Sequence, residues 1–226
     1  WGGKQIAWER WDESVSDRDL RTFLVTSALG ALLIQRGFLP LNATTLSRDG
    51  QAIMLLGCPV SGKSTLAWAL IRNGWQLLSS EISVVDQDGF VWPGLQQLKL
   101  WRNSVEAFGL DWRSLPAVRR GLKRYSLLPP CLATADRAAP LSIIYTIAVR
   151  QHKAGRNEEP ALGQSTSPPN PYAITAFPCY SQREALLKIR NLVFHPRFYR
   201  AMECEVELFT QASSLARQYR GYELQV

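Results

Sequence analysis

Several common signatures are missing from this sequence. Its four cysteines, Cys58, Cys131, Cys179 and Cys204, form no C-x-x-C pair and match no zinc-ligand spacing. We therefore expect reduced thiols in a cytoplasmic protein. The net charge is +7, yet no compact lysine or arginine tract and no nucleic-acid motif are present. The charge favours an anionic partner such as a nucleotide or phosphopeptide, and the missing tract argues against nucleic acid.

No apolar run is long enough to cross a bilayer. Residues 23–34 are apolar for about a dozen positions between Arg21 and Arg36, whereas a spanning helix needs about 20. We interpret this run as a buried helix and expect no membrane partner. With 46% hydrophobic residues and eight tryptophans, the chain suits one domain over residues 1–226 with most tryptophans in its core. Because it begins with Trp1, the sequence leaves room for an upstream segment.

The residue patterns predict an α/β fold with a mixed central sheet and C-terminal helices. Capping boxes at Ser16 and Ser181 predict helices that end near Arg36 and Arg217. Further helices are expected over residues 63–73 and, capped by Asn103, up to residue 108. Strands are expected over residues 38–46, 51–56, 75–78, 82–85, 91–101 and 141–149. Residues 111–130 read as irregular, and residues 151–171 as a flexible insert.

One motif carries most of the chemistry. The sequence G-x-x-x-x-G-K-S stands between an apolar strand and a helix, the setting that a phosphate-binding loop needs. Its glycines let backbone N–H groups approach phosphates, and the helix adds its positive end. Lys63 reaches the β- and γ-phosphates, and Ser64 ligates Mg²⁺. The nucleotide-binding residues are therefore Gly57, Cys58, Pro59, Val60, Ser61, Gly62, Lys63, Ser64 and Thr65.

Phosphoryl transfer also needs a carboxylate near the γ-phosphate. Such a group holds Mg²⁺ or accepts the proton of the attacking hydroxyl. Glu81 follows the strand at residues 75–78, at the end where strands approach the phosphates. Asp86 and Asp88 flank a hairpin turn, and we interpret them as turn residues. Glu81 is thus the candidate for both the catalytic and the metal-binding carboxylate.

Longer stretches resemble a known family. L-P-L-N-A-T-T-L, G-C-P-V-S-G-K-S-T-L-A-W-A-L and N-G-W-Q-L-L-S-S-E-I-S-V-V-D are similar to the core of HPr kinase/phosphorylases. The similarity is greatest to short relatives, including kinases that phosphorylate serine in lasso peptides, and it covers roughly residues 22–125. It implies a P-loop core related to phosphoenolpyruvate carboxykinase, with ATP and Mg²⁺ as cofactors. A hydroxyl on a peptide or protein is the implied acceptor, and homo-oligomers occur in the family.

The sequence departs from the family pattern in two places. The family usually has a histidine before the loop, where this chain has Asn42, and two aspartates where it has Ser80 and Glu81. The first aspartate is the usual general acid/base, and a serine cannot replace it. Glu81 keeps a carboxylate one residue away. A catalytically degenerate nucleotide-binding regulator or scaffold, and a small-molecule kinase, therefore stay open beside the serine kinase, as does GTP beside ATP.

A basic segment offers further site residues. Arg113, Arg119, Arg120, Lys123 and Arg124 are not interrupted by any acid. They suit either a solvated loop or a grip on the transferring phosphate or on an acidic peptide. The family often has a Lys-Arg pair here, which selects Lys123 and Arg124 as catalytic candidates. His152 is interpreted as a surface residue and His195 as structural, and neither has the partners of a metal site.

Overall fold

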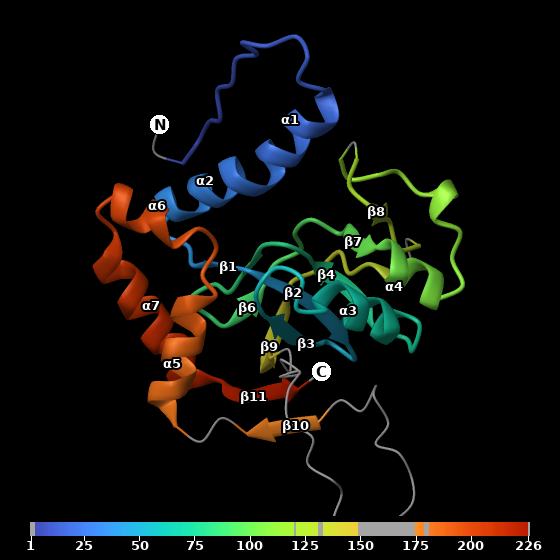
Figure 1. The fold of residues 1–226 in the computed structure, drawn as a ribbon. Coiled ribbons are helices and arrows are strands. Elements are labelled where there is room, and N and C mark those ends of the chain that lie inside the picture. The colour runs from blue at the N-terminus through green and yellow to red at the C-terminus, as the bar shows by residue number, and fades with distance from the viewer. Residues whose placement is uncertain (1–2, 120, 131–132, 149–174, 179–180, 226) are drawn as a thin grey trace, which may run out of the picture.

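A mixed sheet runs through the middle of the computed structural model, which describes residues 3–119, 121–130, 133–148, 175–178 and 181–225 (Figure 1). Its strands are β2 (Ala43–Arg48), β3 (Gln51–Leu56), β4 (Gln76–Ser79), β6 (Phe90–Val91), β9 (Ala139–Ala148), β10 (Thr175–Pro178) and β11 (Arg220–Gln225). The order is β10-β11-β9-β3-β2-β4, with β6 paired to β9. Strands β3 and β11 are parallel to β9, and the remaining pairs are antiparallel. The predicted mixed sheet is confirmed.

Helices and two short strand pairs complete the fold. The pairs are β1 (Pro40–Leu41) with β5 (Ser83–Val84), and β7 (Leu98–Trp101) with β8 (Arg124–Leu127). The helices are α1 (Asp17–Phe23), the π-helical turn η1 (Leu24–Ala28), α2 (Leu29–Gln35), α3 (Lys63–Ile71), α4 (Arg102–Ala107), the 3-10 turn η2 (Trp112–Ser114), α5 (Gln182–Asn191), α6 (Pro196–Ala201) and α7 (Glu205–Gln218). The predicted C-terminal helices are thus present.

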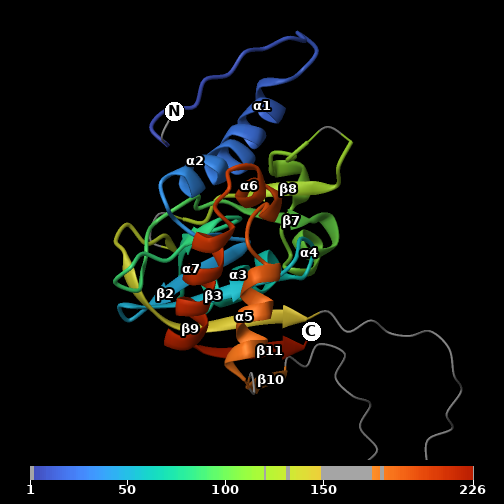
Figure 2. The same cartoon turned by 90° about the vertical axis from the view of Figure 1, so that its left-hand side faces the viewer.

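The sheet is buried on both faces. Strand β3 sends Met54 into a cluster with Ala212 and Leu215 of α7, and Leu55 into a second cluster with Ala67 of α3. Because successive side chains of a strand point to opposite faces, a strand covered on both sides reads as a continuous apolar run. Figures 1 and 2 show α5 and α7 together on one side, with α3, α4 and the β7–β8 pair on the other. The loop at residues 57–62 joins the C-terminal end of β3 to the start of α3.

Local signals in the sequence correctly identify several elements. Ser16 Oγ accepts a hydrogen bond from the Asp19 N–H, and Ser181 Oγ accepts one from the Glu184 N–H. Both contacts satisfy an unpaired donor at a helix start. The predicted strand at residues 51–56 coincides with β3, and α3 begins at Lys63 as expected. The two N-caps and the strand–loop–helix unit are therefore readable from short stretches of chain.

Other expectations are wrong. Residues 111–130 are not wholly irregular, because Arg124–Leu127 forms β8 against β7. Strands β10 and β11 are not among the predicted strands, since β11 is half polar and forms only where β9 offers it a parallel edge. The cap predicted at Asn103 is absent: α4 starts at Arg102, and the Asn103 side chain accepts from the Ser104 N–H inside the first turn.

The tryptophans also differ from expectation. Of those that the structure describes, none is fully buried, and Trp8, Trp11 and Trp92 are exposed.

Among the described residues no helix is both long and apolar enough to span a membrane. Cys58 and Cys204 are free thiols. Cys131, Cys179, Arg120 and the predicted insert at residues 151–171 lie outside the described residues.

Candidate functional site

The loop between β3 and α3 has the geometry of a phosphate cradle. Gly62 stands at the N-cap of α3 with φ 92°, a left-handed conformation that glycine adopts without strain. A Cβ on Gly57 would lie 2.5 Å from Ser61 Oγ, so a side chain there would displace the Ser61 hydroxyl. Ser61 Oγ is itself buried without a hydrogen-bond partner in the described structure. Helix α3 has no side-chain cap, which leaves its first N–H groups for a ligand.

Lys63 lies beneath this loop. Its ammonium donates to Gly57 O at 2.6 Å and to Cys58 O at 2.7 Å. Burial lowers the pKa of Lys63 to about 8, although the negative charge of Glu81 acts in the opposite direction. The side chain therefore has its position set by the backbone of the loop, and its charge is sensitive to pH near neutrality.

The β7–β8 pair presents a charged wall opposite the loop. Register places Lys99 opposite Ser126, and Trp101 opposite Arg124. Because alternate residues share a face, Lys99, Trp101 and Arg124 point to one side. The intervening Leu98 and Leu100 enter the core. The alternation L-K-L-W in the sequence is the signal from which Lys99 could have been found.

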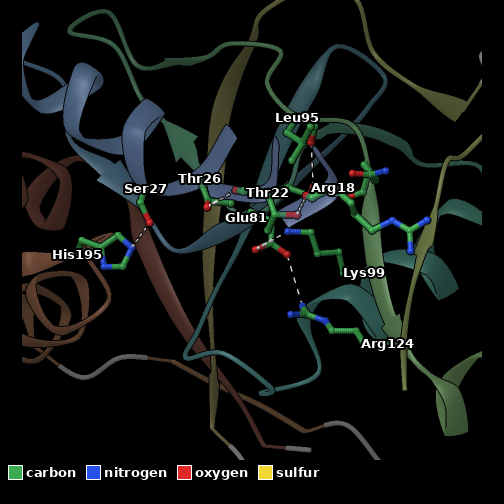
Figure 3. A network of polar contacts seen from close by, with 11 residues as sticks. Arg18, Thr22, Thr26, Ser27, Glu81, Leu95, Lys99, Arg124 and His195 are labelled. Carbon is green, nitrogen blue, oxygen red and sulfur yellow. Dashed lines mark hydrogen bonds and ion pairs between the residues drawn. The ribbon is translucent and has the colours of Figure 1, made fainter. Parts of the chain in front are cut away.

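Glu81 joins this wall. It follows β4 in a left-handed conformation with φ 66°, which is rare for a residue with a side chain. One carboxylate oxygen lies 3.5 Å from Lys99 Nζ and the other lies 3.5 Å from Arg124 Nη2 (Figure 3). Lys99 is buried, and Glu81 and Arg124 are partly buried. Glu81 is thus a carboxylate held between two cations.

Ser80 points away from this arrangement. Its side chain is buried, and its hydroxyl lies 2.9 Å from Leu95 O and 2.6 Å from Gln97 O, where it donates. These contacts hold the chain that leads into β7. Ser80 therefore has a structural role, and Glu81 is the carboxylate that reaches the site.

One cavity of about 1070 Å³ collects these groups. It contains most of the predicted site: Pro59, Val60, Ser61, Gly62, Lys63, Ser64, Thr65, Glu81, Lys123 and Arg124. Gly57 and Cys58, which were also predicted, are not among its lining residues, and their carbonyl groups accept hydrogen bonds from Lys63. Residues that sequence reasoning did not assign to the site are Thr44, Lys99, Trp101, Arg102, Ser104, Glu106, Val193, Phe194, His195 and Pro196, and Asn42 and Asn103 also line it.

The basic segment divides between surface and site. Lys123 and Arg124 line the cavity, as selected. Arg113 lies over the Trp112 ring at 4.7 Å from its centroid, and Arg119 pairs with Asp19 of α1 at 3.5 Å. Asp86 accepts from the N–H groups of Asp88 and Phe90, which confirms it as a turn residue. His152 lies outside the described residues.

The residues present fit a magnesium nucleotide. Mg²⁺ takes few protein ligands and fills its shell with water and phosphate oxygens. Ser64 and Glu81 both line the cavity and supply a hydroxyl and a carboxylate. No group of three or more metal-ligating His, Cys, Asp or Glu side chains occurs among the described residues. The free N–H groups of α3 and the unpartnered Ser61 hydroxyl suit phosphate oxygens.

Comparison with known proteins gives a distant likeness. No family model and no curated protein matches the chain. Among solved structures, 36 chains match. One is the HPr(Ser) kinase/phosphatase from Coxiella burnetii, 14% identical over 79% of this chain and 98% of that chain, with a TM-score of 0.32. A likeness at this level assigns no role to any residue.

Proposed function

We propose that this chain is an ATP- and Mg²⁺-dependent kinase that phosphorylates a serine-type hydroxyl on a peptide or protein. The observation that supports it is the meeting of a phosphate cradle and a carboxylate between two cations in one cavity. Binding alone needs the cradle and Lys63. A carboxylate opposite them supplies what transfer requires in addition.

Each residue has a role in this proposal. The N–H groups of the loop and the Lys63 ammonium hold the β- and γ-phosphates. Ser64 and Glu81 would hold Mg²⁺, which neutralises charge on the phosphates when bound. Arg124 and Lys123, with Lys99, stabilise the charge that spreads over the transferring phosphoryl group.

The transfer step follows from general chemistry. The acceptor oxygen forms a bond to the γ-phosphorus as the bond to the bridging oxygen breaks, and ADP leaves. Glu81 takes the hydroxyl proton, either directly or through water. Little base strength is needed for this step, because the hydroxyl proton leaves late in a loose transition state.

A second candidate is a nucleotide-binding protein without turnover. Ser80 favours it, because the hydroxyl at this position is used in two contacts to backbone carbonyl groups. In that case Glu81 would serve only to position Lys99 and Arg124. The two candidates share nucleotide binding and differ in transfer.

Labelled ATP and serine-containing peptides separate them. Wild type should transfer label, and Glu81→Gln should lose about a hundredfold in rate or more while it still binds nucleotide by calorimetry. Lys63→Ala should lose binding itself. Glu106→Gln is the matched control, since Glu106 lines the same cavity but pairs with Arg102 at its exposed edge. Nucleotide binding without any transfer by wild type would establish the second candidate.

A further inference from the structure

The cavity has a charged part and an uncharged part. Its positive charge comes from Lys63 at the start of α3, Arg102 of α4, Lys99 and Arg124 of the β7–β8 pair, and Lys123 just before β8. Another part of the lining consists of Asn42, Thr44 and the segment Val193, Phe194, His195 and Pro196. None of these carries a fixed charge, and burial together with Arg197 holds the pKa of His195 below its usual range. One wall therefore suits phosphates, and the other suits a neutral group.

The uncharged wall is built from distant parts of the chain. Val193 forms a bridge with Leu41, and the Phe194 N–H donates to Pro40 O at 2.9 Å. The Phe194 ring packs against Gly30 of α2, where a Cβ would lie 2.6 Å from the ring. Such a fit leaves the segment little freedom to move. The wall is therefore a fixed surface.

His195 is held on this surface at a backbone cost. Its φ is 48°, and a residue with a side chain in this left-handed region is under backbone strain that its surroundings must offset. Its Nε2 lies 3.3 Å from Ser27 Oγ of the π-helical turn η1 (Figure 3), and π-helical turns are frequent at functional sites. The Phe194 and Phe198 rings lie 4.4 Å and 5.0 Å from the imidazole, between centroids. These contacts hold the ring in one orientation, with Nδ1 free of any partner in the described structure.

The direction of the loop decides which end receives which substrate. The loop begins beside Asn42, where the Gly57 N–H faces Asn42 O at 3.4 Å. It ends in α3, where Thr65 Oγ1 lies 3.1 Å from Ser104 Oγ of α4. With Lys63 on the β- and γ-phosphates, a triphosphate along the loop has its nucleoside near α4. In-line transfer places the acceptor on the far side of the γ-phosphorus from the leaving group, and therefore from the nucleoside.

From this arrangement, and resting on the proposed kinase function, we infer that Val193, Phe194, His195 and Pro196 form the acceptor subsite. It takes a hydroxyl-bearing residue whose neighbours are apolar, and His195 is a positioning residue that hydrogen-bonds the acceptor chain through Nδ1. An acidic neighbour would find no cation among these four residues, with Arg197 the cation beside them, and would be repelled by the γ-phosphate. Asn103, at the α4 end of the cavity, contacts the nucleoside instead.

The test uses two peptide sets with one serine at the same position, flanked by Phe, Leu and Ala or by Asp and Glu. Transfer from labelled ATP should favour the apolar set in wild type. His195→Gly should raise the KM for that set about fivefold to tenfold, the loss of one hydrogen bond, with unchanged affinity for a non-hydrolysable ATP analogue. Glycine accepts a φ of 48°, so this variant should fold, which thermal unfolding checks. His195→Asn, which tolerates the same backbone and keeps a polar group, should recover part of the loss. Asn103→Ala should instead weaken the affinity for the ATP analogue and leave the peptide KM unchanged.

Three outcomes would overturn the inference while the kinase proposal stands. They are a preference of wild type for acidic flanks, an unchanged peptide KM in His195→Gly, and a loss of nucleotide affinity in that variant. The last would assign His195 to the nucleoside. Transfer to neither set would instead refute the kinase function, and the acceptor subsite with it.

Discussion

Lys63 should make nucleotide affinity depend on pH in a range where a lysine with an ordinary pKa stays charged. Burial lowers its pKa to about 8 in the free protein, and only the ammonium form can pair with phosphate. About 90% of the side chains are charged near pH 7 and about 10% near pH 9. Affinity should therefore fall about tenfold over this range. A lysine with an ordinary pKa of about 10.4 would remain more than about 90% charged throughout.

Titration calorimetry with a non-hydrolysable ATP analogue and Mg²⁺ measures both the affinity and the proton balance. If the bound form is fully protonated, about half a proton should be taken up per nucleotide near pH 8, since half of the free protein lacks it. Uptake is obtained from the dependence of the heat on the ionisation enthalpy of the buffer. Phosphate itself, with a second pKa of about 6, changes little over this range.

Lys63→Arg is the matched control, because arginine keeps its charge over the whole range. It should bind more weakly, since its guanidinium does not fit the contacts to Gly57 O and Cys58 O, but its affinity should not vary with pH. An affinity of wild type that is constant between about pH 7 and about pH 9, with no proton uptake, would refute the reasoning.

Three further substitutions test individual contacts. Ser80→Asp should destabilise the fold by about 3 kcal/mol or more, because a buried carboxylate would face two carbonyl oxygens. Ser80→Ala should cost only about 1–2 kcal/mol. Urea unfolding measures both, and a stable Ser80→Asp with gained activity would contradict the buried position of Ser80. Gly30→Ala should cost about 1–3 kcal/mol through overlap with the Phe194 ring, and a neutral effect would show that the ring is free to move. Lys99→Met should leave Glu81 with one cation and slow transfer, with Lys99→Arg closer to wild type; equal rates in wild type and Lys99→Met would exclude Lys99 from the site.

The sequence is most informative where function depends on neighbours along the chain. The cradle is a continuous strand–loop–helix unit, so its glycines, Lys63 and Ser64 follow directly from the motif and its flanking residues. Glu81 follows from the end of the preceding strand, and it does line the cavity. Lys123 and Arg124 follow from the family resemblance, and they line it as well.

Other residues escape sequence reasoning because their signals depend on pairing. The pattern around Arg124 indicates irregular chain, and it contains no trace of the β7–β8 register that places Arg124 diagonally across from Lys99. His195 precedes a proline among aromatic residues, which favours a structural interpretation. That interpretation holds for its ring contacts, but its place in the cavity wall follows from the bridge between Val193 and Leu41, 152 positions earlier.

The sequence alone therefore predicted a phosphate-binding loop, its place in the chain and the lysine and serine that it presents, because each of those positions is constrained by its immediate neighbours. The tertiary structure decided what faces the loop. It directed Ser80 into backbone contacts and Glu81 into the cavity, and it joined Lys99, Arg124 and the segment at His195 around one space. Such meetings depend on strand register and on the direction of side chains, which no short stretch of sequence contains.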